Sequence, residues 1–141
     1  MSQVLMIEDN PNDIKLIGLT LASVFDFLYA ASVCEALEVL KTHRPDIILL
    51  DLGLPDSKGV DTIDLFVKSF PQIPVVVWSG ADDAAEAIRH GAENFILKGR
   101  SLSVVEEAIT NAIKSHKFTQ VKQDIATMQK VIETDNKSEK P

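Results

Sequence analysis

The sequence predicts an α/β fold in which helices cover both faces of a five-stranded parallel sheet. The first supporting observation is the segment 46–51, where four large apolar residues stand between two aspartates. Such an unbroken apolar run is typical of a strand buried on both faces, as strands of parallel sheets are. The second is the alternation of short apolar runs with stretches of helical periodicity, which favours strand–helix units joined by right-handed crossovers.

The predicted elements form five strand–helix pairs along the chain. The first strand spans residues 3–7, and the helix after it begins near Pro11, because proline is common in the first helical turn. A second strand is predicted at 27–31, and the helix that follows is capped by Ser32. The later elements are a central strand within 46–51, a helix at 60–70, a strand at 75–78, a short helix at 84–90 ending at Gly91, a strand at 95–97 and a helix from Ser101.

Composition limits the kinds of partner. The 141 residues fit one domain with a proper core, and 21 acidic against 14 basic residues give a net charge of −7. Because phosphate backbones are bound by clustered lysine and arginine, we expect no nucleic acid partner. No apolar run is long enough to cross a bilayer, and Cys34 is the only cysteine, so we expect no membrane insertion and a cytoplasmic, reducing location.

Reactive side chains stand where four of the five predicted strands end. Glu8 and Asp9 follow the first strand and Asp51 follows the third. Ser79 ends the fourth strand and Lys98 the fifth. The carboxyl ends of parallel strands share one edge of the sheet, where ligands bind, so we expect these side chains to converge.

The residue types at this edge indicate phosphoryl transfer. Neighbouring carboxylates repel one another and raise the pKa of at least one of them unless a cation is present. Mg²⁺ suits such an all-oxygen site and often keeps phosphate oxygens among its ligands. A lysine supplies a point charge for phosphate and a serine supplies a hydroxyl donor. Asp51 is then the nucleophile that forms an aspartyl phosphate.

Five segments of the chain resemble, in order and approximate spacing, the motifs of the receiver domain of two-component response regulators. They are Glu8-Asp9-Asn10-Pro11, Asp51-Leu52-Gly53-Leu54-Pro55-Asp56, Ser79-Gly80, Gly91-Ala92 and Phe95-Ile96-Leu97-Lys98. The resemblance covers residues 3–116 and implies a flavodoxin-like (βα)₅ fold, with a receiver domain at 1–117. It also implies a phosphoryl group received from a histidine kinase or histidine phosphotransfer protein. We expect that the protein is not an enzyme, except that it catalyses its own phosphorylation and dephosphorylation.

The resemblance implies a metal site on one side of the phosphoacceptor. By position, Asp51 is the phosphoacceptor and a ligand of Mg²⁺. Asp9 is a direct ligand of the ion, and Glu8 acts through a water molecule. The backbone carbonyl of Gly53 is a further ligand.

The resemblance also implies a switch on the other side. Ser79 is the hydroxyl that moves toward the phosphoryl group, and Lys98 is the ion-pair partner of that group. Phe95 is the aromatic residue that turns inward behind Ser79. This movement is expected to change a protein-binding surface around the fourth and fifth helices.

The chain departs from the family at three points. In the family a proline usually follows the lysine and is joined to it by a cis peptide bond, whereas this chain has Gly99. A cis bond before a residue other than proline costs about 2.5–4 kcal/mol. Either this bond is trans and the loop takes another route, or the freedom of glycine absorbs the geometry. The span from Ser79 to Lys98 is short, so we expect a short fourth helix. No DNA-binding or enzymatic output domain follows, and we expect a stand-alone receiver.

The segment 118–141 is predicted to be a helical tail with a disordered end. Its apolar residues recur at 3-4-3-4 spacing over about two heptads, and their phase shifts near 116–118, which predicts a break or bend. Either the helix packs back on its own domain, or it serves dimerisation or docking on a partner. From Thr134 onward we expect disorder. The apolar residues are Phe118, Val121, Ile125, Met128 and Ile132.

Two other functions compete with a phosphoacceptor. A scaffold acting through its C-terminal helix would need no phosphorylation. An aspartyl-phosphate phosphohydrolase usually has a general acid two residues after the nucleophile, where this chain has Gly53. A nucleotide-binding Rossmann-like domain fits less well, because acids and not a glycine-rich loop follow the first strand.

Overall fold

The structure is a computed structural model, which describes residues 1–138, with side chains described to residue 132. The described residues form one five-stranded parallel sheet with the order β2-β1-β3-β4-β5. This is the flavodoxin-like strand order and confirms the predicted fold. The strands are β1 (Gln3–Ile7), β2 (Asp26–Ala30), β3 (Ile47–Leu50), β4 (Val75–Ser79) and β5 (Asn94–Leu97).

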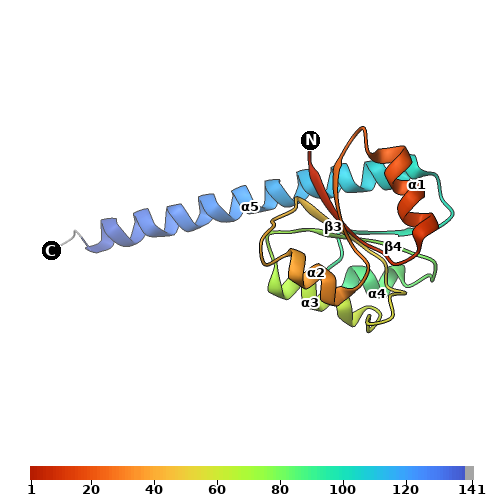
Figure 1. Ribbon diagram of the computed structural model, residues 1–141. Coiled ribbons are helices and arrows are strands. Elements are labelled where there is room, and N and C mark those ends of the chain that lie inside the picture. The colour runs from red at the N-terminus through yellow and green to blue at the C-terminus, as the bar shows by residue number, and fades with distance from the viewer. Residues whose placement is uncertain (139–141) are drawn as a thin grey trace.

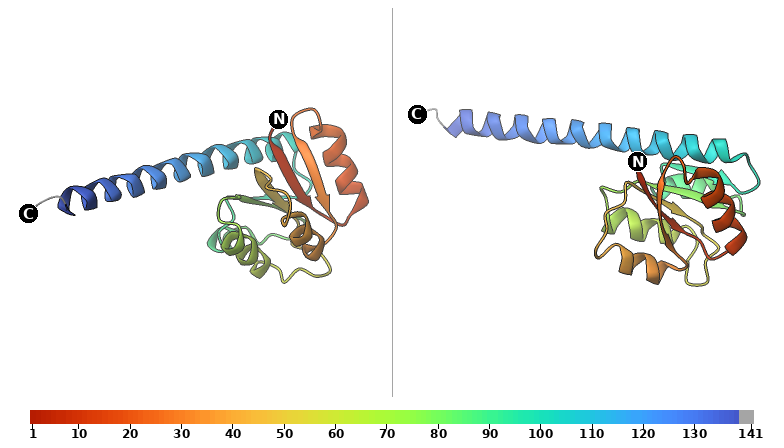
Figure 2. Two further views of the ribbon diagram at one scale, coloured as in Figure 1. Left: turned by 60° about the vertical axis from the view of Figure 1, so that its left-hand side comes forward. Right: turned by 45° about the horizontal axis from the view of Figure 1, so that its top comes forward.

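Helices cover both faces of this sheet (Figure 1 and Figure 2). Helices α1 and α5 lie on one face, and α2, α3 and α4 lie on the other. The helices are α1 (Pro11–Leu21), α2 (Val33–Val39), α3 (Asp61–Ser69), α4 (Ala84–Arg89) and α5 (Leu102–Ser138).

The sheet divides the core into two apolar clusters. Along β1, Leu5 and Ile7 belong to the cluster under α2, α3 and α4, whereas Val4 and Met6 belong to the cluster under α1 and α5. This alternation arises because successive side chains of a strand point to opposite faces. All four residues of β3 are buried, which confirms that the central apolar run is covered on both sides.

Side chains at the helix starts hold the loops near the carboxyl ends of the strands. Asn10 Oδ1 accepts hydrogen bonds from the backbone N–H groups of Asn12 and Asp13, which fixes the start of α1 beside the end of β1. Ser32 Oγ accepts a hydrogen bond from the N–H of Glu35, as predicted for the cap of α2.

A second cap of α2 comes from a distant loop. The two carboxylate oxygens of Asp56 accept hydrogen bonds from the N–H groups of Val33 and Cys34, each at 3.0 Å. These bonds lower the pKa of Asp56. The contact ties the loop after β3 to the start of α2, more than twenty residues earlier in the chain.

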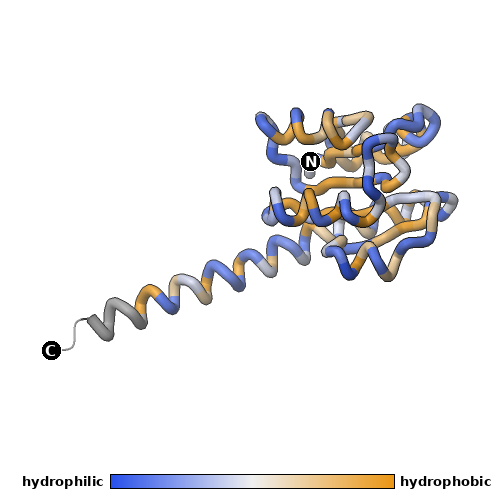
Figure 3. Tube along the Cα trace, turned by 90° about the horizontal axis from the view of Figure 1, so that it is seen from below, coloured by the Kyte–Doolittle hydropathy of each residue, from blue (hydrophilic) through white to orange (hydrophobic). Residues whose placement is uncertain are grey.

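Helix α5 differs from the expected tail. We predicted a break or bend near 116–118, but the helix is continuous and leaves the body of the domain as a rod (Figure 1 and Figure 3). Helical backbone hydrogen bonds are local, so a shift in the apolar stripe does not interrupt them. The backbone is helical through Ser138, whereas we expected disorder from Thr134; residues 139–141 lie outside the described residues.

The apolar stripe of the tail does not pack on its own domain. Its five side chains are 51–64% exposed, so the alternative in which the tail folds back is wrong for this structure. His116 links α5 to the body just before this stripe, with ring nitrogens 3.1 Å from Glu93 Oε1 and 2.9 Å from the carbonyl oxygen of Pro71. The division of the chain at residue 117 into receiver and tail stays a prediction.

Among the described helices, none has the length and apolarity needed to cross a membrane.

The short helix α4 ends at a glycine that the fold requires, and this generates a stability prediction. Gly91 has φ +108°, and a Cβ there would lie 3.2 Å from both methyl carbons of Val67. We therefore expect Gly91→Ala to lower the free energy of unfolding by more than about 1 kcal/mol in urea denaturation. Gly80→Ala is the control, because a Cβ there meets nothing within 4 Å. Equal stability of the two variants would contradict this account.

Candidate functional site

The carboxyl ends of four strands meet at one edge of the sheet, as predicted. The N–H of Asp51 donates to the carbonyl of Ile7 at 3.0 Å, which joins the ends of β1 and β3. The N–H of Lys98 donates to the carbonyl of Ser79 at 2.8 Å, which joins the ends of β4 and β5. Asp51, Ser79 and Lys98 all line one open pocket of about 430 Å³.

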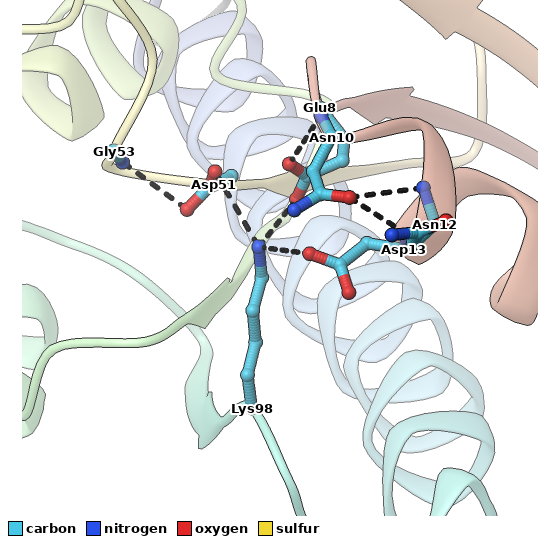
Figure 4. A network of polar contacts seen from close by, with 7 residues as sticks. All are labelled: Glu8, Asn10, Asn12, Asp13, Asp51, Gly53 and Lys98. Atoms are coloured by element: carbon cyan, nitrogen blue, oxygen red, sulfur yellow. Dashed lines mark hydrogen bonds and ion pairs between the residues drawn. The ribbon is translucent and has the colours of Figure 1, made fainter.

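Lys98 lies at the centre of a polar network in this pocket (Figure 4). Its Nζ is 2.8 Å from Glu8 Oε2, 2.8 Å from Asp13 Oδ2 and 3.5 Å from Asp51 Oδ2. Burial lowers the pKa of Lys98, but the bonds to Asp13 and Glu8 and the charge of Asp51 outweigh that effect, so the pKa is raised. The ammonium also lies 5.0 Å from the ring centre of Trp78. Lys98 is therefore held in its charged form among three carboxylates.

Glu8 is a buried acid with an incomplete set of hydrogen bonds. Only 2% of the residue is exposed, and Oε1 accepts a hydrogen bond from the N–H of Asn10 at 3.1 Å. Oε2 faces Lys98 as an ion pair but has no partner in hydrogen-bond geometry among the described residues. Burial, together with the charge of Asp51, raises the pKa of Glu8, while Lys98 and the Asn10 N–H oppose the rise. This oxygen has room in its coordination for a cation.

Three acids are close enough to share one cation. Glu8, Asp9 and Asp51 each offer an oxygen, and these oxygens lie within 4.8 Å of one another. Asp9 is exposed, whereas Glu8 and Asp51 are buried. The N–H of Gly53 donates to Asp51 Oδ1 at 3.1 Å, which orients the carboxylate. A mostly carboxylate site of this size suits a hard divalent ion such as Mg²⁺.

The remaining predicted site residues lie near the pocket. Ser79 is buried at the end of β4, and Phe95 in β5 is half-buried against the core under α2, α3 and α4. The structure describes one position of each side chain, so the movement predicted for them stays a prediction. No cis peptide bond occurs among the described residues, so the bond before Gly99 is trans, and Gly99 adopts φ +100°.

Asp13 is a site residue that sequence reasoning missed. It lies in the first turn of α1, and its carboxylate reaches Lys98 as closely as that of Glu8 does. Its position in the sequence could have revealed it. The helix after the first strand starts at the edge of the sheet where the strands end, so acidic side chains in its first turn lie beside the site.

Known proteins with similar sequences are bacterial regulators. The chain is 37% identical over 93 residues to the luminescence regulatory protein LuxO of Vibrio campbellii, which covers 64% of this chain and 20% of LuxO. It is 30% identical over 116 residues to the response regulator protein PilR of Pseudomonas aeruginosa, covering 79% of this chain and 26% of PilR. The chain thus spans about a fifth to a quarter of the length of these relatives.

Solved structures and a family model agree with this similarity. A response regulator receiver domain from Clostridium thermocellum superposes with a TM-score of 0.76 at 25% identity, covering 84% of this chain and 99% of that one. The family model described as response regulator receiver domain matches residues 4–114. That match spans all five strands apart from the first residue of β1, and the part of α5 that packs on the sheet. The chain therefore belongs to the receiver domain family of two-component response regulators.

Proposed function

We propose that this receiver domain accepts a phosphoryl group on Asp51 from a histidine kinase or histidine phosphotransfer protein, in a reaction that needs Mg²⁺. The observation that carries the proposal is the pocket in which Asp51, Ser79 and Lys98 lie together. Asp51 is oriented on one side by the N–H of Gly53 and paired on the other with Lys98. Neither a phosphorylation-independent scaffold nor a phosphohydrolase gains support from the similar proteins.

The transfer step is a displacement at phosphorus. An oxygen of Asp51 forms the new O–P bond, and the P–N bond to the donor histidine breaks. The bonding electrons stay with the departing nitrogen. Lys98 places a positive charge 3.5 Å from the accepting carboxylate, where it offsets the charge that arrives with the phosphoryl group. The chain is proposed to catalyse only this transfer to its own Asp51 and the later hydrolysis of the resulting aspartyl phosphate.

The three clustered acids fit a Mg²⁺ ion. Asp9 and Asp51 are proposed as direct ligands, with the carbonyl of Gly53, and Glu8 as a ligand through water. The burial of Glu8 next to Asp51 supports this assignment, because Lys98 is paired with Glu8 Oε2 and a further cation would offset the charge of the clustered acids. When bound, Mg²⁺ neutralises charge on the acids and on the transferring phosphoryl group.

The phosphoryl group is proposed to act through Ser79, Lys98 and Phe95. Its oxygens accept hydrogen bonds from the Ser79 hydroxyl and the Lys98 ammonium. Movement of Ser79 frees space that Phe95 fills from β5. Because β5 pairs with β4 and packs against both α4 and α5, this change is proposed to reach the surface of these two helices, which we propose contacts a downstream protein.

The exposed stripe of α5 is proposed to bind the same stripe of a second copy of the chain. Helix α5 packs on the sheet through Val105 and Ile109. At 3.6 residues per turn, Val121 and Ile125 lie roughly 160° and 200° around the helix from Val105. The stripe therefore faces away from its own domain and is open to a partner. Its 3-4-3-4 spacing is the seam that two like helices share in a coiled coil.

The phosphoacceptor assignment is tested by intact-mass measurement after incubation with acetyl phosphate and Mg²⁺. We expect the mass to rise by one phosphoryl group in the wild type and not in Asp51→Asn, because the amide is not a nucleophile. Asp46→Asn is the control, since Asp46 lies at the other end of β3, where its carboxylate accepts a hydrogen bond from the N–H of Gln3. Phosphorylation of Asp51→Asn to the wild-type level would refute the assignment.

The metal assignment is tested by calorimetric titration with Mg²⁺. Asp9→Asn removes a proposed direct ligand, so we expect the Mg²⁺ affinity to fall by about tenfold or more. Asp83→Asn removes an acid that lines the same pocket without a proposed metal role, and should change the affinity much less. If Asp9→Asn binds Mg²⁺ as tightly as the wild type, the ligand assignment is wrong.

The partner of the tail is tested by light scattering over a range of concentrations. We expect a concentration-dependent dimer that Ile125→Glu abolishes, because a carboxylate in the seam loses its hydration on association. Gln123→Glu is the matched control: it lies on the side of the helix opposite the stripe and should leave the dimer intact. A wild-type chain that stays monomeric at high concentration would rule out self-association.

A further inference from the structure

We propose that Asp13 is a positioning residue that competes with the phosphoryl group for Lys98 and so favours the unphosphorylated state. This inference rests on the proposed function of Asp51. It assigns a regulatory role to a residue outside the five segments that carry the family resemblance.

The geometry places Asp13 and Asp51 on different sides of one ammonium group (Figure 4). Asp13 Oδ2 is 2.8 Å from Lys98 Nζ and accepts its hydrogen bond, whereas Asp51 Oδ2 is farther away, at 3.5 Å. The closer contact of Lys98 is thus with the first turn of α1 and not with the phosphoacceptor.

Asp13 is held in place independently of Lys98. Its backbone N–H donates to the side chain of Asn10, which caps α1. A negative charge in the first turn of a helix is also stabilised by the helix dipole. The first turn of α1 therefore keeps Asp13 beside Lys98 by contacts that do not involve Asp51.

After phosphorylation, the phosphoryl oxygens also attract the Lys98 ammonium. A phosphoryl group brings about −1.5 to −2 charge and three acceptor oxygens to Asp51. Lys98 has three N–H donors, shared in this structure among carboxylates on both sides. Movement toward the phosphoryl oxygens weakens the bond to Asp13. The free energy of that bond is subtracted from the stability of the phosphorylated state.

The test compares three variants in the full chain, with beryllofluoride as the phosphoryl mimic at saturating Mg²⁺. Asp13→Asn removes the charge that holds Lys98, and Asp13→Glu keeps it. Asp83→Asn removes a charge from the same pocket at a residue that forms no ion pair with Lys98 among the described residues. Emission of Trp78, the only tryptophan, is recorded before and after addition, because the Lys98 ammonium lies against its ring.

We expect Asp13→Asn to bind beryllofluoride about two- to fivefold more tightly than the wild type, the range supported by an ion pair of partly exposed groups. Its Trp78 emission should also differ from that of the wild type before beryllofluoride is added. Asp13→Glu should restore wild-type behaviour, and Asp83→Asn should resemble the wild type in both measurements.

Three results would overturn the inference. Equal tightening in Asp13→Asn and Asp83→Asn would mean that only net charge matters. Weaker beryllofluoride binding in Asp13→Asn would mean that Asp13 supports the phosphorylated state. Loss of Mg²⁺ binding as complete as in Asp9→Asn would make Asp13 a metal ligand.

Failure of the proposed function gives a different pattern. If the wild type binds no beryllofluoride, the phosphoacceptor role of Asp51 fails, and Trp78 emission alone decides the role of Asp13. A change in Asp13→Asn without one in Asp83→Asn supports the holding of Lys98 by Asp13; no change in either variant refutes it.

Discussion

One ammonium group, that of Lys98, lies within 3.5 Å of carboxylate oxygens of Glu8, Asp13 and Asp51. Glu8 and Asp51 are buried and Asp13 is partly buried, and acids gathered in this way repel one another unless a cation offsets their charge. Lys98 is the internal cation that lets the acids stay close in the absence of a metal ion. The site thus has an excess of negative charge that a divalent ion can balance, and a lysine that is already next to the accepting oxygen.

The sheet determines where these charges lie. The apolar residues of β3 keep Asp51 at the end of a strand buried on both faces, so its backbone position is rigid while its carboxylate reaches the pocket. The same register brings the ends of β1 and β5 to that edge from either side. The strands β4 and β5 end at the pocket and pack against α5, and β5 also packs against α4, which is the route that the proposed switch would take to the surface.

Patterns local in sequence predicted most of the fold and part of the site. The strand–helix alternation, the Ser32 cap and the short α4 each depend on a few adjacent residues, and the structure contains all three. The convergence of Asp51 and Lys98 was predictable because parallel strands end at one edge.

Other features depend on contacts between distant segments, which no local pattern shows. Asp13 is an ordinary first-turn acid until the fold brings the first turn of α1 within reach of the Lys98 side chain. Asp56 ends the motif in the loop after β3, yet its carboxylate caps α2, which starts more than twenty residues earlier in the chain. The bend expected near 116–118 was inferred from a change in the side that carries apolar residues. A helix that leaves its domain can change its apolar side without bending, because a second molecule can cover the new one.

The central claim is that the carboxylate at the end of β3 receives the phosphoryl group. The most direct measurement is to treat the phosphorylated chain with borohydride, which reduces an aspartyl phosphate to homoserine, and to map the modified residue by peptide mass spectrometry. We expect homoserine at position 51, and only in samples that contained Mg²⁺ and a phosphodonor. Modification at Asp9 or Asp13 instead, or no modified carboxylate at all, would contradict it.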